Sequence, residues 1–112
     1  MNGSDPAVER GSGNVFADLD LPDADAHRLK AEIVSRIDAI VRQRGITQTE
    51  TARLLGLSQP DVSRLLRGDF RDYSLERLLR LLTRLGRDVD IVIRQRRSGA
   101  GGRLRIAASK TA

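Results

Sequence analysis

The side chains with the most recognisable chemistry are hydrogen-bonding groups gathered within residues 59–67. On an α-helix, which turns by about 100° per residue, Gln59, Ser63 and Arg67 share one arc of about 80°. Arg64 lies about 60° beyond Arg67. Glutamine amides pair well with adenine edges, and arginine guanidinium groups pair well with guanine edges in the major groove of DNA. This chemistry needs a helix that presents the whole arc to a duplex.

The opposite side of the same helix is apolar. Val62, Leu65 and Leu66 fall between about 240° and 340° from the glutamine at the helix start. Asp61, near about 200°, lies outside the donor arc, where it would not face phosphates. An ordinary amphipathic surface helix has the same pattern, and most such helices bind nothing. The neighbouring sequence must therefore decide between the two interpretations.

A second short helix precedes this one and is joined to it by a three-residue turn. The sequence predicts a helix over Gln48–Leu55, with Thr47 as its N-cap and Gly56 as a left-handed residue at its end. Ser58 then caps the next helix, which ends at Gly68. Two short helices joined by a glycine-containing turn are typical of the helix-turn-helix motif, which favours DNA recognition over an ordinary surface helix.

The flanking segments complete a mainly α domain of four to five helices. Apolar residues at helical spacing predict a helix over Ala26–Arg44 and another over Leu75–Leu85, the second capped by Ser74. The β-branched run Val89–Ile93 predicts a strand, and Arg103–Ile106 predicts a second strand that could complete a hairpin. The alternative for this C-terminal part is a disordered basic arm.

The predicted organisation has four parts. Residues 1–13 form a disordered tail, 14–88 the helix-turn-helix domain, 89–108 the C-terminal strand, hairpin or basic arm, and 109–112 a short tail. Leu81 falls outside the apolar stripe of its helix and is expected to face a partner subunit.

Composition narrows the classes of function. The 112 residues carry a net charge of +5; residues 1–26 hold a charge of −5, so the remainder carries +10, which suits a polyanionic partner. The chain has no cysteine and a single histidine, His27, so a disulfide framework, a histidine metal site and a catalytic triad are all disfavoured. Three aromatic residues are too few for single-strand stacking, which favours duplex DNA. With no apolar run long enough for a membrane span and no secretory signal pattern, we expect a cytoplasmic protein that is not an enzyme and needs no cofactor or metal.

The motif residues resemble those of Cro/lambda-repressor-like (XRE-type) helix-turn-helix proteins. The matching positions are Gln48, Ala52, Gly56-Leu57-Ser58, Val62-Ser63 and Gly68. More narrowly, Asn14 to about Ala108 is similar to small antitoxins of the HigA type, through the stretches NVFADLDLPDADAHRLKAEI and YSLERLLRLLTRLGRDVDIVI. The chain departs from the family pattern at Thr51, where many repressors carry a larger apolar residue.

The resemblance implies a lambda-repressor-like repressor that binds double-stranded operator DNA. We expect a homodimer, because so small a core is marginal as a monomer and a single helix-turn-helix reads only a few base pairs. The resemblance further implies a type II antitoxin that regulates its own operon and neutralises a small basic toxin of the RelE/HigB-like class. The two alternatives are a stand-alone phage-type or housekeeping repressor and a helix-turn-helix adaptor that binds only protein. The predicted DNA-binding residues are Gln48, Ser58, Gln59, Pro60, Ser63, Arg64 and Arg67, of which Gln48 and Ser58 are assigned to phosphates by the resemblance.

Overall fold

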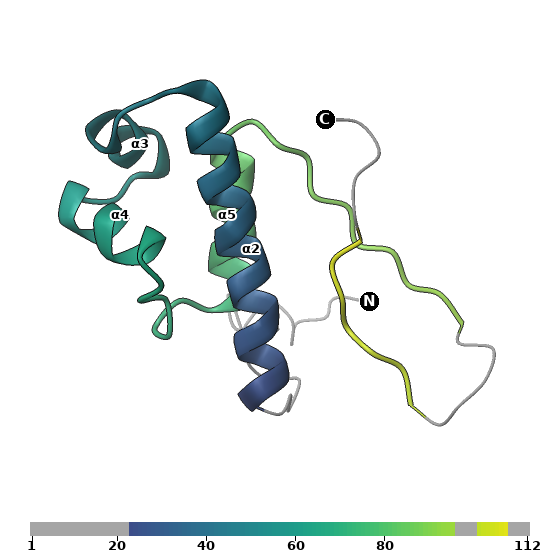
Figure 1. Cartoon of the computed structure of the whole chain (residues 1–112). Helices are drawn as coiled ribbons and strands as arrows, with labels where there is room; N and C mark the ends of the chain where they lie inside the picture. Colours follow the sequence, from purple (N-terminus) through teal and green to yellow (C-terminus); the bar gives the residue numbers. More distant parts are fainter. Residues whose placement is uncertain (1–22, 96–100, 108–112) are drawn as a thin grey trace, which may run out of the picture.

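The structure, a computed structural model, describes residues 23–95 and 101–107 (Figure 1). The predicted tails 1–13 and 109–112 lie outside these residues. The described part contains four helices: α2 (Asp23–Arg44), α3 (Gln48–Leu55), α4 (Gln59–Leu66) and α5 (Leu75–Arg84). In Figure 1, α3 and α4 lie together on one side of α2 and α5, and the segment that follows α5 leaves on the opposite side. None of the described helices is both long and apolar enough to cross a membrane.

Helix α2 is the longest element and begins three residues earlier than predicted, at Asp23 instead of Ala26. Acidic residues at a helix N-terminus interact favourably with the helix dipole, and Asp23 and Asp25 supply two of them. The predicted apolar stripe is buried: Ile33 and Ile37 are almost completely inaccessible to solvent. This stripe packs mainly against α5 and also against α4.

The predicted helix ends are confirmed at the three serine or threonine caps. The hydroxyl oxygens of Thr47, Ser58 and Ser74 each accept a hydrogen bond from the backbone N–H three residues further on. Gly56 ends α3 with φ +73°, in the left-handed region. Its N–H and that of the following residue both bond the carbonyl oxygen of Ala52, which closes the end of the helix.

Leu81 departs from the sequence-based expectation, and Thr51, which departs from the family pattern, also lies in the core. Leu81 is only 4% exposed and belongs to the chain's own core, so its assignment to a partner subunit is wrong. Thr51 is fully buried, and its hydroxyl donates a 2.8 Å hydrogen bond to the carbonyl oxygen of Thr47. A small polar side chain is therefore accommodated between the helices because its only hydroxyl is satisfied within α3.

Arginine side chains join the helices at their C-terminal ends. Arg84 Nε donates to the carbonyl oxygen of Leu54 over 3.0 Å, which ties α5 to the end of α3. Arg44, at the end of α2, donates to the carbonyl oxygen of Leu85 just beyond α5. The last carbonyls of a helix have no partner within it, so these bonds satisfy groups that would otherwise rely on water.

The C-terminal segment is extended, but no strand is assigned within residues 87–95 or 101–107, so the predicted strands Val89–Ile93 and Arg103–Ile106 are not confirmed. Val89 and Ile106 are half-buried and pack against the helical core. Arg36 also donates to the carbonyl oxygen of Ala107 over 3.3 Å. The two pieces are thus attached to the core by side chains.

We predict that Gly56→Val destabilises the domain by roughly 1–3 kcal/mol, because a β-branched residue is strained at positive φ. A Cβ atom at Gly56 would also lie 3.2 Å from Arg84 Nη2. Urea unfolding followed by circular dichroism measures the loss. Gly101→Val is the control, since no atom lies within 4 Å of its Cβ position. Wild-type stability of Gly56→Val would show that the turn is misplaced.

Candidate nucleic-acid interface

Helix α4 is held by its apolar side and presents its polar side to solvent. Val62 and Leu65 have no exposed surface, which fixes the rotation of the helix about its axis. The predicted site residues lie on the accessible side, half-buried in the case of Ser63 and exposed in the others: Gln48, Ser58, Gln59, Pro60, Ser63, Arg64 and Arg67. Six of the seven belong to α4 or its caps, and Gln48 is the first residue of α3. The fold therefore brings the predicted residues onto one continuous surface.

The first residues of α3 and α4 are joined by their side chains. Gln59 Nε2 donates a 2.8 Å hydrogen bond to Gln48 Oε1. The bond restrains two exposed side chains that would otherwise sample many rotamers, and it leaves Gln59 Oε1 and one of its N–H groups for another partner. This contact between residues eleven apart was missed from the sequence, because it depends on how the two helices cross.

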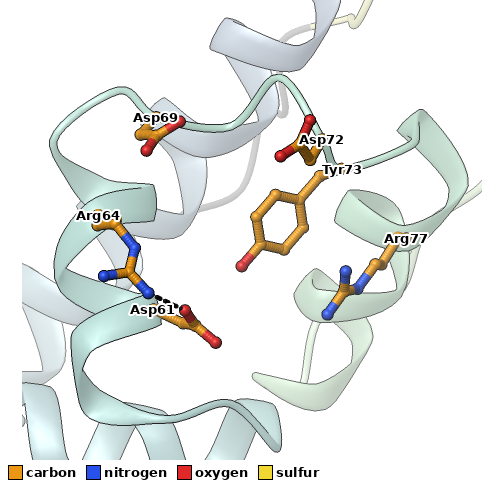
Figure 2. Close-up of a pocket in the computed structure, with 6 residues that line it drawn as sticks. All are labelled: Asp61, Arg64, Asp69, Asp72, Tyr73 and Arg77. Atoms are coloured by element: carbon orange, nitrogen blue, oxygen red, sulfur yellow. Dashed lines mark hydrogen bonds and ion pairs between the residues drawn. The ribbon is translucent and has the colours of Figure 1, made fainter.

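Arg64 is engaged by a neighbour on its own helix. Its guanidinium group bonds Asp61 Oδ1, and both side chains are about half exposed (Figure 2). The bond to Arg64 is the main reason that the pKa of Asp61 lies below its ordinary value, and the Ser58 hydroxyl adds to the effect. Sequence analysis placed Asp61 outside the donor arc and missed the pairing, although Asp and Arg three residues apart on a helix are neighbours.

This ion pair lies in an open cavity of about 280 Å³ between α4 and the start of α5. The cavity is lined by three carboxylates, two guanidinium groups and a phenol: Asp61, Asp69, Asp72, Arg64, Arg77 and Tyr73 (Figure 2). Arg77 lies over the ring of Tyr73, with Cζ 4.5 Å from the ring centroid. Burial raises the pKa of the Tyr73 phenol, which keeps it a neutral hydrogen-bonding group.

No group of three or more His, Cys, Asp or Glu side chains in residues 23–95 and 101–107 is arranged to hold a metal ion. His27 is exposed and stacks on Phe70, with the ring centroids 5.1 Å apart. The geometry instead defines a protein that presents a short polar helix on a helical support.

Comparisons with known proteins place the chain in a family. A family model described as a helix-turn-helix domain matches residues 15–94. A solved structure assigned by name to the XRE family of transcriptional regulators is 36% identical, with a TM-score of 0.74; the match covers 79% of this chain and all of the other. No curated protein matches the chain. The chain belongs to the XRE-type helix-turn-helix family of transcriptional regulators.

We predict that Arg64→Met raises the pKa of Asp61 toward its ordinary value, because the largest cause of its depression is removed. A depressed folded-state pKa stabilises the fold above the unfolded pKa, and this contribution is lost as the pH falls through the folded value. The contribution is small because Asp61 is exposed. A carboxylate NMR titration measures the change, with Arg67→Met as control. An unchanged pKa in Arg64→Met would assign the depression to Ser58 instead.

Proposed function

We propose that the protein is a sequence-specific transcriptional repressor that reads double-stranded DNA with α4. The observation that carries this proposal is the polar surface of α4 described above, held outward by the buried Val62 and Leu65. A helix presented in this way fits the major groove, where each base pair offers a distinct set of hydrogen-bonding groups.

Each polar side chain of this surface has a role in the proposal. Gln59, oriented by Gln48, pairs with an adenine, and Arg64 pairs with a guanine. Arg67, near the end of α4, contacts either a base or a phosphate. Gln48 and the Ser58 cap, at the first turns of α3 and α4, contact phosphates, which helix N-termini attract. Pro60 and Ser63 complete the surface that faces the groove.

We predict that Gln59→Ala and Arg64→Ala each weaken binding to the preferred duplex by about 1–3 kcal/mol and relax the preference at one base pair. The duplex is obtained by selection from a random pool with the wild-type chain, and its single-base variants are measured by fluorescence anisotropy. Arg42→Ala is the matched control, because it removes an exposed arginine from an ion pair on α2.

Two results would contradict this assignment. Equal losses on every sequence would show that Gln59 and Arg64 contact only the backbone. A wild-type chain without salt-dependent binding to any duplex would favour the alternative of an adaptor that binds only protein.

We also propose that the repressor acts as a homodimer, joined through residues 91–93. Ile91, Val92 and Ile93 are 68%, 70% and 92% exposed. Successive side chains of an extended segment point to opposite sides, so both sides of this segment present apolar surface. Pairing with the same segment of a second copy would cover that surface and satisfy its backbone groups. A dimer also places two reading helices about 34 Å apart, one turn of DNA.

We further propose that the protein is the antitoxin of a type II pair and binds a small basic toxin of the RelE/HigB-like class. The support is the resemblance of Asn14–Ala108 to HigA-type antitoxins, together with charge. The segment 14–25 contains four acidic residues with Val15, Phe16, Leu19 and Leu21 among them. Carboxylates attract a basic partner, and apolar side chains supply buried anchors.

We predict that native mass spectrometry of the chain purified from its native source finds two copies bound to a small basic protein. Deletion of residues 1–22, which precede α2, should release the basic protein and leave the dimer. Ile93→Asp should give a single copy, because burying a carboxylate at a paired strand is costly.

The dimer and the toxin partner are contradicted by different results. A wild-type monomer, free and on DNA, would overturn the dimer. Two copies without a second protein would favour the stand-alone repressor.

A further inference from the structure

The contact between Asp61 and Arg64 places an acidic side chain beside a residue proposed to read DNA. Helix α4 carries three polar residues on the arc that faces the groove, and Arg64 lies at the edge of that arc, about 60° from Arg67. Asp61 lies about another 60° beyond Arg64, further from the arc. The ion pair therefore draws the guanidinium group away from the reading surface and toward the cavity at the start of α5 (Figure 2).

The surroundings of the cavity favour this position of Arg64. The cavity is lined by three carboxylates, those of Asp61, Asp69 and Asp72, and by only two guanidinium groups, those of Arg64 and Arg77. The Arg77 charge is itself held over the ring of Tyr73. Arg64 thus has a docked position within the protein that competes with any site on DNA. An aspartate carboxylate is charged at neutral pH, so the competition operates there.

The two kinds of DNA contact compete with this position unequally. A phosphate can bind the guanidinium group through two oxygens, but Arg64 would then exchange one anionic partner, Asp61, for another of the same sign. A guanine edge offers two acceptors in the plane of the guanidinium group, which a single carboxylate oxygen does not match. Arg64 should therefore leave Asp61 for the correct base and remain paired on sequences without it.

We propose that Asp61 is a specificity-determining residue that withholds Arg64 from phosphates on non-cognate DNA. It acts through Arg64 and contacts no base itself. This inference rests on the proposed function, in which α4 reads a duplex. Asp61 thereby lowers the affinity of the protein for random DNA sequence more than it lowers the affinity for the preferred site.

The test compares binding to the duplex selected by the wild-type chain with binding to poly(dA-dT), which offers no guanine edge, over a range of salt concentrations. Asp61→Asn keeps the size of the side chain and removes its charge. We expect affinity for poly(dA-dT) to rise by about fivefold and the magnitude of the salt slope to rise by about 0.9, the value of one added phosphate contact. Affinity for the selected duplex should rise less, so the specificity ratio falls. Asp61→Ala should behave in the same way.

Two controls separate this effect from a general change of charge. Asp38→Asn removes the same charge from an ion pair on α2, with Arg42, and should leave the ratio unchanged. In an Arg64→Met background, Asp61→Asn should no longer change the affinity for poly(dA-dT) or the salt slope, because the residue through which it acts is gone. Thermal unfolding of each variant confirms that α4 remains folded.

The outcomes distinguish the inference from the function on which it rests. An equal rise on both duplexes, the same rise in the Arg64→Met background, or no rise at all would overturn the role of Asp61 and leave the repressor intact. A wild-type chain that binds neither duplex would overturn both.

Discussion

Helices α3 and α4 contain eight residues each, a length at which a helix is marginal in water on its own. Their existence depends on burial against each other and against the two longer helices. Val62 and Leu65 anchor α4, and Leu55 anchors α3. The same burial fixes the direction of every polar side chain on the outer surface, because a short capped helix seated on two apolar residues cannot rotate. The same buried residues thus stabilise the two short helices and orient their polar side chains toward solvent.

The forces that hold the helices together are mostly neutral. Within residues 23–95 and 101–107, every ion pair joins residues three or four apart on one helix. Exposed pairs of this kind are worth about 0.3–0.5 kcal/mol. The connections between elements are apolar contacts and hydrogen bonds, among them the Gln48–Gln59 bond and the bonds from Arg44 and Arg84 to helix-end carbonyls. An arginine that donates to a carbonyl gains a partner without requiring a carboxylate, so the acidic side chains remain available for local roles.

The sequence predicted the features that depend on local chemistry. The caps at Thr47 and Ser58 and the left-handed Gly56 follow from side-chain hydrogen bonding and φ preference within a few residues, and all three are confirmed. Features that depend on how helices cross were not predictable in this way. The burial of Leu81 requires knowledge that α5 is covered on more than one side, and the Gln48–Gln59 bond requires the angle between α3 and α4. The β-branched run 89–93 has the composition of a strand, but a strand needs a partner, and sequence composition does not supply one.

The separation of neutral and charged interactions has a consequence for regulation. Because the core and the carbonyl bonds carry the fold, we expect changes in salt to alter the free energy of unfolding little. Contacts with phosphates release counterions and respond to salt strongly. The Asp61–Arg64 pair is an ion pair within the fold that includes a residue proposed to bind DNA. As a contribution to stability, an exposed pair of this kind is nearly negligible. A contact between Arg64 and one phosphate would be an interaction of similar kind and size. Under the proposal above, an ion pair too weak to matter for folding can therefore change which DNA is bound.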